Sequence, residues 1–263
     1  MYYESFGPDS GYPVVLIHPI GGNIDIWEEE IRLIRRRGFR AIAYELRGHN
    51  RSGMGRIQAY AMHDLVNDLH ALLNELAIGR CTLVGHSIGG QISCIYAATY
   101  PERVESLIVI SSSSEVIPDS DLEKHHGTRE TARTKGMAAL AEETMNENEV
   151  ARKAFRNKKK REIFERIFTK TTAEGFAAAT VALYSIPEDT TEILKAHGFN
   201  IFGIVGRDDE VFVRLMRQMQ KGIPEMKVKI VESGDHWLII ENHKAFDEAF
   251  AEALDNTISL PSL

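Results

Sequence analysis

Short apolar runs typical of β-strands alternate along this chain with stretches of helical periodicity. The apolar runs lie at residues 13–18, 39–45, 81–85, 106–110, 201–205 and 228–231. They lack alternation of polar and apolar residues, which is typical of strands in a parallel sheet covered on both faces. The helical stretches lie at residues 26–37, 62–76, 91–98 and 246–254. This alternation predicts an α/β fold with a doubly wound, mostly parallel sheet.

The alternation is interrupted in the middle of the chain. Residues 116–185 carry no convincing strand pattern and are rich in Ala, Glu, Lys and Thr, and the strand pattern resumes at Ile201. We therefore interpret this segment as several helices inserted into one α/β unit. The predicted organisation is a core domain of residues 1–115 and 186–263, with a helical insertion at 116–185.

Composition excludes several classes of function. The 31 Lys and Arg against 38 Asp and Glu give a net charge of −7, whereas nucleic-acid binding needs a basic field. The basic run at residues 152–161 is interpreted as a solvated helix face. Two cysteines cannot form a disulfide framework, and no apolar run approaches the roughly 18 residues of a membrane span. Because residues 1–12 also lack a signal-peptide pattern, we expect a cytoplasmic protein with no nucleic-acid or membrane partner.

One segment combines a nucleophilic side chain with glycines at a fixed spacing, Gly85-His86-Ser87-Ile88-Gly89. It directly follows one predicted strand and precedes a predicted helix, which is the context of a nucleophile elbow. A serine in such a turn has a strained backbone, so the residues two before and two after it must be nearly free of side chain. The turn also places the hydroxyl at a helix N-terminus, where partial positive charge favours an oxyanion. A chance match in a loop is the alternative, and the strand and helix around it favour Ser87 as the nucleophile.

A serine hydroxyl needs a base that takes its proton. The chain has ten histidines, of which His236 lies in a loop between the last predicted strand and the final helix. Loops at the carboxyl ends of strands converge on the site in an α/β sheet. We therefore expect His236 to be the base.

The acid that orients this histidine is expected in the loop after the preceding strand. Three consecutive carboxylates, Asp208, Asp209 and Glu210, occupy that loop, and residue type alone leaves all three open. Stabilising the reaction's oxyanion also needs two backbone N–H donors. One is that of Ile88, directly after the serine, and a glycine-rich loop at residues 18–22 should supply the other.

These motifs, taken in order, resemble those of the α/β-hydrolase superfamily, and in particular its serine esterase and enol-lactonase subgroup. The matching segments are residues 14–27, 45–53, 85–89, 206–209, and 234–237 with Glu241. In this family the acid lies three residues after the glycine of its loop, so the resemblance implies Asp209. It also implies the N–H of Ile20 as the second oxyanion donor, despite Pro19 in place of the usual glycine. The insertion resembles the family's helical cap, which sets substrate choice.

The resemblance implies a serine hydrolase that cleaves a small-molecule carboxylic ester or lactone through an acyl-enzyme on Ser87, with no metal or cofactor. Trp27, Phe212 and Trp237 are candidate walls of the substrate pocket, with plain core packing as the alternative. Other reactions on the same fold remain open: hydrolysis of a carbon–carbon bond, cofactor-free perhydrolysis similar to bacterial haloperoxidases, and a lyase reaction. A ligand receptor with slow turnover is the alternative from another class.

Overall fold

A computed structural model describes residues 1–55, 60–117, 124–186 and 188–258 of the chain. Residues 118–123 of the predicted insertion lie outside the described residues. So do residues 56–59, 187 and 259–263 of the predicted core domain.

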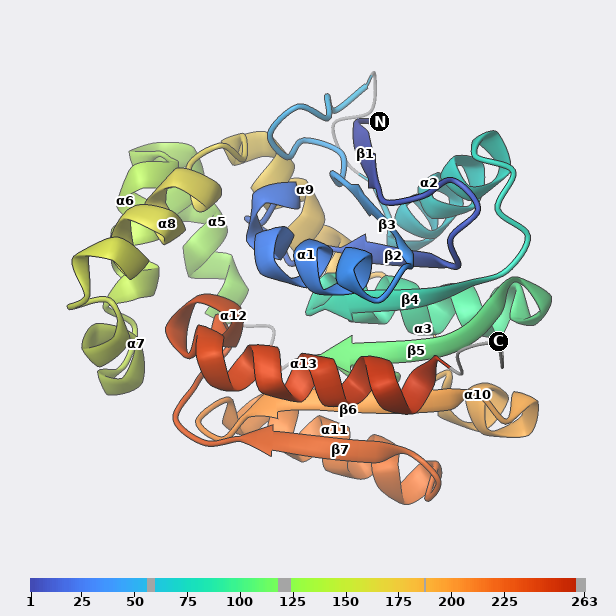
Figure 1. The fold of residues 1–263 in the computed structure, drawn as a ribbon. Helices are drawn as coiled ribbons and strands as arrows, with labels where there is room; N and C mark the ends of the chain where they lie inside the picture. Colours follow the sequence, from blue (N-terminus) through green and yellow to red (C-terminus); the bar gives the residue numbers. More distant parts are fainter. Residues whose placement is uncertain (56–59, 118–123, 187, 259–263) are drawn as a thin grey trace.

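A central sheet of seven strands, counted over the described residues, has the order β1-β3-β2-β4-β5-β6-β7 (Figure 1). The strands are β1 (Tyr3–Phe6), β2 (Pro13–Ile17), β3 (Arg40–Tyr44), β4 (Cys81–His86), β5 (Val104–Ile110), β6 (Asn200–Gly206) and β7 (Lys227–Val231). Strands β2 to β7 pair in parallel, while β1 pairs antiparallel with β3 at one edge. The six predicted runs correspond to β2–β7, which confirms the α/β class and the mostly parallel sheet. Strand β1 was not predicted, because its short, half-exposed sequence carries no continuous apolar run.

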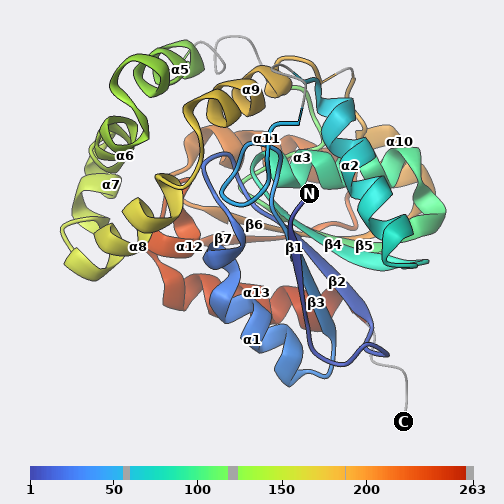
Figure 2. The same cartoon turned by 90° about the horizontal axis from the view of Figure 1, so that it is seen from above.

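Helices cover both faces of the sheet (Figure 2). One face carries α1 (Glu28–Arg36), preceded by the 3₁₀ helix η1 (Ile24–Trp27), and α13 (His243–Thr257). The other carries α2 (Met62–Glu75), α3 (Ile88–Thr99) followed by η2 (Pro101–Arg103), α10 (Thr191–His197) and α11 (Glu210–Gly222). In β2 the side chains of Val15 and Ile17 enter one core, and those of Val14 and Leu16 enter the other. Burial on both faces therefore explains why the strands read as continuous apolar runs.

The segment between β5 and α10 is mostly helical over the residues that the structure describes. Its helices are α5 (Lys124–Lys135), α6 (Met137–Met145), α7 (Glu149–Ala154), α8 (Lys158–Phe168) and α9 (Ala173–Leu183). Helices α7, α8 and α9 begin after Asn148, Asn157 and Thr172, whose side chains each accept a backbone N–H of the first turn. Helices α5 to α8 lie beyond the carboxyl ends of the strands (Figure 1). The segment thus lies at the edge of the sheet where the predicted site residues converge.

No helix among the described residues combines the length and the apolar character that crossing a bilayer requires.

Candidate active site

Ser87 lies at a sharp turn between β4 and α3. Its backbone has φ 56° and ψ −121°, a conformation that L-residues rarely adopt. A Cβ atom on Gly85 would lie 2.1 Å from the carbonyl oxygen of Gly89, and one on Gly89 would lie 2.2 Å from that of Ile17. Both distances are far inside van der Waals contact, so the two glycines are required for this turn. The steric argument made from the sequence therefore holds at both positions.

Two hydrogen bonds to the backbone of Ser87 hold the turn in place. Its N–H donates to the carbonyl of Ile110 in β5 at 2.9 Å, and its own carbonyl accepts from the Ser112 hydroxyl at 2.7 Å. A Cβ on Gly90 would lie 2.5 Å from the Cβ of Ser112, so this third glycine allows Ser112 to approach. Strain of about 1–3 kcal/mol in such a residue persists only when its surroundings fix it. These two hydrogen bonds hold the strained backbone of Ser87 in place.

The imidazole of His236 links Ser87 to a carboxylate. Its Nε2 lies 3.0 Å from Oγ of Ser87, and its Nδ1 lies 2.9 Å from Oδ2 of Asp209. His236 follows β7, whereas Asp209 follows β6 and precedes α11. Asp209 is 6% exposed and Ser87 is 8% exposed, whereas the side chain of His236 between them is 32% exposed and so remains open to solvent. We call these three residues the Ser–His–Asp chain.

The geometry separates the three consecutive carboxylates. Asp209 reaches His236, while the carboxylate of Asp208 accepts the backbone N–H of Gly234 at 3.1 Å. Glu210 is exposed at the first residue of α11. The structure therefore places Asp209, the residue that the family register implied, beside the histidine, and it gives Asp208 a role in joining two loops.

The loop after β2 forms a tight turn beside Ser87. The N–H of Gly22 donates to the carbonyl of Pro19 at 2.9 Å, and Gly21 has φ 78°, so the turn has Ile20 and Gly21 at its centre. Ile88 is the first residue of α3, so its N–H has no acceptor within the helix. The roles of Ile20 and Ile88 as oxyanion donors stay predictions.

A model of the alpha/beta hydrolase fold family matches residues 12–243 of this chain. The chain is an α/β hydrolase. Among solved structures, a carboxylesterase of Nitrososphaera gargenis shares 50% identity and a TM-score of 0.92 over 96% of this chain and 93% of its own. The enol-lactonase of Burkholderia xenovorans LB400 has the same fold, with 22% identity and a TM-score of 0.82 over 96% and 95%.

Several curated relatives match over shorter stretches, whereas the non-heme chloroperoxidase CPO-A1 of Kitasatospora aureofaciens is 27% identical over 90% of this chain and 88% of its own. The protein RutD of Variovorax paradoxus is 35% identical over 114 residues, which are 43% of this chain and 43% of that protein. This α/β hydrolase thus aligns with less than half the length of that relative. The family membership is shown by the longer matches, and the substrate remains to be proposed from the site.

The ionisation of His236 is set by its neighbours. Burial lowers the pKa of this imidazole, but the charge and hydrogen bond of Asp209 raise it more, and Asp235 adds to the rise. The net pKa of His236 lies above its ordinary value of 6.5. In this α/β hydrolase His236 is therefore protonated more readily than a free histidine.

A second histidine positions the first. The buried His86 donates a hydrogen bond from Nε2 to the backbone carbonyl of His236 at 2.8 Å, and the two rings lie 5.4 Å apart. Burial and the nearby His236 hold the pKa of His86 well below its usual range, so it stays neutral. From the sequence, His86 is visible only as part of the elbow. Its position directly before the nucleophile is the signal that could have marked it.

Two further buried histidines fix the loop after β2. His18 accepts the N–H of Leu46 at Nε2 (3.0 Å) and donates from Nδ1 to the carbonyl of Pro19 (2.8 Å). His49 accepts the N–H of Gly21 at Nε2, at 3.2 Å. Burial lowers the pKa of His18 well below its usual range and that of His49 to about 4. Both rings are therefore neutral, and their hydrogen bonds to the backbone of Pro19 and Gly21 hold the loop on either side of Ile20.

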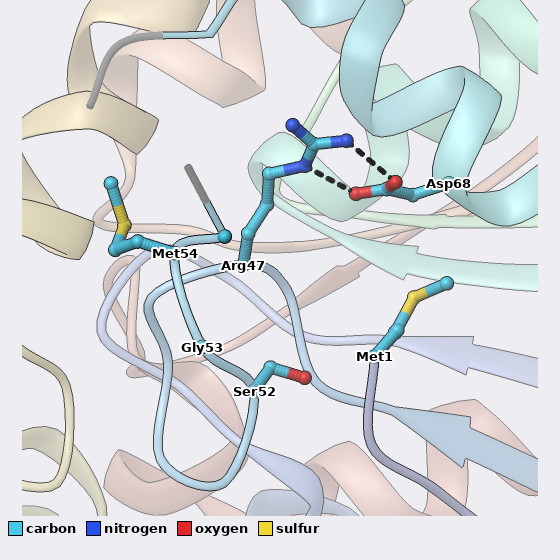
Figure 3. Close-up of a pocket in the computed structure, with 7 residues that line it drawn as sticks. Met1, Arg47, Ser52, Gly53, Met54 and Asp68 are labelled. Atoms are coloured by element: carbon cyan, nitrogen blue, oxygen red, sulfur yellow. Dashed lines mark hydrogen bonds and ion pairs between the residues drawn. The ribbon is translucent and has the colours of Figure 1, made fainter. Parts of the chain in front are cut away.

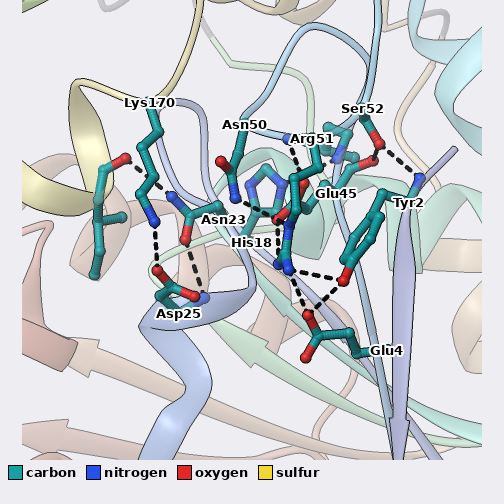
Figure 4. A network of polar contacts seen from close by, with 12 residues as sticks. Tyr2, Glu4, His18, Asn23, Asp25, Glu45, Asn50, Arg51, Ser52 and Lys170 are labelled. Atoms are coloured by element: carbon teal, nitrogen blue, oxygen red, sulfur yellow. Dashed lines mark hydrogen bonds and ion pairs between the residues drawn. The ribbon is translucent and has the colours of Figure 1, made fainter.

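The turn at residues 45–53 is built around a fully buried carboxylate (Figure 4). Glu45 accepts hydrogen bonds from the Asn50 amide at 2.7 Å, and from the backbone N–H and guanidinium of Arg51 at 2.7 and 2.8 Å. Asn50 has φ 45°, a left-handed conformation that asparagine tolerates. The buried carboxylate of Glu45 is thus satisfied by hydrogen bonds from two residues of the same turn.

The predicted pocket aromatics occupy different surroundings. The ring of Phe212 stacks on that of His236, with centroids 5.1 Å apart and planes at 25°. Trp237 is almost fully buried, and its ring meets Phe164 of α8 edge-on at 4.8 Å. Trp27 has no exposed surface and packs in the core of the α1 face. The burial of Trp27 favours the alternative of plain core packing, and the roles of Phe212 and Trp237 as pocket walls stay predictions.

The helical segment contacts the loop that carries His236. The amide of Asn148, at the start of α7, donates to the carboxylate of Asp235. Lys160 of α8 donates to the backbone carbonyl of Glu241 in α12 (Leu238–Glu241) at 2.5 Å. The position of this loop is therefore linked to the position of α7 and α8.

A surface pocket of about 210 Å³ lies apart from these residues (Figure 3). Its lining residues are Met1, Arg47, Ser52, Gly53, Met54, Gly55 and Asp68. The guanidinium of Arg47 donates to both oxygens of Asp68, at 2.5 and 2.6 Å. The positive charge in this pocket is thus already paired, and no member of the Ser–His–Asp chain lines it.

Proposed function

We propose that this α/β hydrolase cleaves carboxylic esters, lactones included, through an acyl-enzyme on Ser87. The observation that carries the proposal is the continuous Ser–His–Asp chain, with contacts of 3.0 and 2.9 Å at a strained turn. A carboxylesterase that shares 50% identity over nearly its whole length supports ester cleavage.

The proposed reaction starts with proton transfer. His236 takes the proton of the Ser87 hydroxyl as Oγ attacks the substrate carbonyl, and Asp209 stabilises the imidazolium that forms. The N–H groups of Ile20 and Ile88 bind the tetrahedral oxyanion, which is worth about 10²–10³ in kcat for each donor. His236 then protonates the leaving alkoxide. A water molecule, deprotonated by the same histidine, hydrolyses the acyl-enzyme and restores Ser87.

We assign substrate selection to the helical insertion at residues 116–185, acting as a cap. The support is its place beyond the carboxyl ends of the strands and the contacts of α7 and α8 with the histidine loop. Phe212 is the proposed wall nearest to the reacting atoms, because its ring stacks on His236. A small-molecule ester with an apolar group next to its carbonyl fits these surroundings.

Ester turnover and covalent labelling together test the proposal. We expect many turnovers per enzyme on p-nitrophenyl esters from acetate to octanoate, with an optimum chain length that measures the space under the cap. We also expect a fluorophosphonate probe to modify Ser87 alone, read out by peptide mass spectrometry. A single stoichiometric release without further turnover would support a receptor, and labelling of Ser87 without any ester turnover would overturn the ester assignment.

The pH profile of ester hydrolysis should depend on Asp235, the carboxylate that precedes His236 in the sequence. Asp235 raises the pKa of His236, and the reaction needs the neutral imidazole, so the acid limb of kcat/KM should lie above pH 6.5. Asp235→Asn should move that limb down by about half a pH unit, because it removes one negative charge. The amide oxygen of the new side chain can still accept from Asn148, so the plateau rate should change little.

The matched control is Glu232→Gln, which neutralises an exposed carboxylate of the same loop that pairs with Arg207. Its acid limb should coincide with that of the wild type. Equal shifts in the two variants would mean that loop charge in general, and not the position of Asp235, sets the pKa.

A further inference from the structure

Helices α1 and α13 pack side by side on one face of the sheet (Figures 1 and 2). Glu30 of α1 lies at this junction and is only 1% exposed. Both of its carboxylate oxygens are buried, and neither accepts a hydrogen bond from an N–H or hydroxyl group of the described residues, while the carboxyl group of Asp247 lies beside them. Burying a charged carboxylate without a partner is strongly unfavourable, so the arrangement calls for either a compensating positive charge or a proton on the carboxyl group.

Two side chains of α13 face this carboxylate. His243 and Asp247 are four residues apart and therefore share one face of the helix. Ligand atoms of Glu30, His243 and Asp247 all lie within 4.8 Å of one another. The Nδ1 of His243 is 3.3 Å from Oδ1 of Asp247. Two ligands of a tetrahedral Zn²⁺, each about 2.0–2.2 Å from the ion, lie about 3.3–3.5 Å apart, so this pair already has the required spacing.

We propose that Glu30, His243 and Asp247 form a binding site for a divalent transition-metal ion, with Zn²⁺ as the expected occupant. One imidazole nitrogen and two carboxylate oxygens are a ligand set that Zn²⁺ accepts, and the two carboxylates balance its charge. The side chains of His243 and Asp247 are 48% and 36% exposed, which gives an ion a path from solvent to the buried Glu30. The remaining coordination position is left for water.

The ion would tie the start of α13 to α1. Helix α13 begins at His243, shortly after His236, and the short helix α12 lies between them. The site is separate from the Ser–His–Asp chain and takes no part in the proposed reaction. Its function would be to stabilise the packing beneath the histidine loop. The sequence analysis expected no metal site, since α1 and α13 lie at opposite ends of the chain and no local motif joins these three residues.

The rival explanation is a proton shared between the carboxyl groups of Glu30 and Asp247. Metal titration of EDTA-treated full-length protein separates the two. We expect one equivalent of Zn²⁺ to bind in calorimetry and to raise the Tm, and Co²⁺ to bind with the visible absorption of a tetrahedral site. His243→Asn and Asp247→Asn, both at partly exposed positions, should weaken the affinity by at least about tenfold.

The matched control is His197→Asn, at an exposed histidine of α10, which should bind Zn²⁺ as the wild type does. Glu30→Gln tests the buried ligand, and it should lose the rise in Tm. Zn²⁺ binding that is absent in the wild type, or equal in wild type, His243→Asn and Glu30→Gln, would overturn the proposal. None of these measurements uses enzymatic activity, so their outcome is independent of the proposed function.

Discussion

Ser87→Ala should lower kcat for ester hydrolysis by about 10⁶-fold. The substitution removes the Oγ atom that lies 3.0 Å from Nε2 of His236 and leaves the rest of the Ser–His–Asp chain in place. Only binding and the oxyanion donors then remain, and together they account for a residual rate of about 10³–10⁴ over water. Alanine carries a Cβ as serine does, so the turn at φ 56° bears the same strain in both proteins. Steady-state kinetics on p-nitrophenyl esters, with the Tm measured beside them, tests this expectation.

A second serine of the same helix provides the control. Ser93 is buried in α3, and its hydroxyl donates to the carbonyl of Gly89 at 2.8 Å without reaching His236. Ser93→Ala removes a hydroxyl of the same size and should keep kcat within about a few-fold, with a small loss of stability. If Ser87→Ala retained wild-type turnover, the hydrolysis would belong to another nucleophile, and the acyl-enzyme mechanism would be wrong.

The elbow could be predicted from the sequence because its physics is local. The glycines at 85 and 89 are needed wherever a strand turns into a helix at a strained serine, and their contacts of 2.1 and 2.2 Å show that need directly. The parallel sheet was predictable for a similar reason, since burial on both faces leaves continuous apolar runs. Such features are encoded within a few neighbouring residues, and a single sequence is enough to find them.

Features set by tertiary packing could not be predicted in this way. Trp27 and Phe212 are both large aromatics near predicted motifs, yet one is enclosed in the core and the other stacks on His236. The role of His86, at the end of β4, depends on a contact with the backbone of His236, which lies in the loop after β7. The two residues that we propose share a metal ion with Glu30 come from the far end of the chain. In each case the deciding contact is long-range, and residue type alone does not encode it.

The acid of the Ser–His–Asp chain could be predicted only in part from the sequence. Residue type left Asp208, Asp209 and Glu210 equivalent, and a family register selected Asp209. The structure adds a physical reason, because the backbone N–H of Asp208 donates to the carbonyl of Gly234 at 3.0 Å and its carboxylate accepts from the same residue. This double contact turns Asp208 toward the histidine loop backbone and leaves Asp209 to meet the imidazole.

Asp209→Asn should therefore lower kcat by about 10⁴-fold. The asparagine fits the same space, but it no longer stabilises the imidazolium, and its amide group can hold the imidazole in the wrong tautomer. The pKa of His236 should also fall, because the charge and hydrogen bond of Asp209 raise it in the wild type. The acid limb of the residual activity should then move to lower pH. Steady-state kinetics from about pH 5 to about pH 9 measures both the fall in kcat and the shift of the acid limb.

Asp208→Asn is the matched control, because it changes the neighbouring carboxylate of the same loop. Its amide oxygen can still accept the N–H of Gly234, so kcat and the acid limb should stay close to those of the wild type. A loss in Asp208→Asn as large as that in Asp209→Asn would mean that the loop acts as one structural unit and that the direct contact at 2.9 Å is not decisive. A large loss confined to Asp209→Asn would instead assign the acid to the one carboxylate that reaches His236.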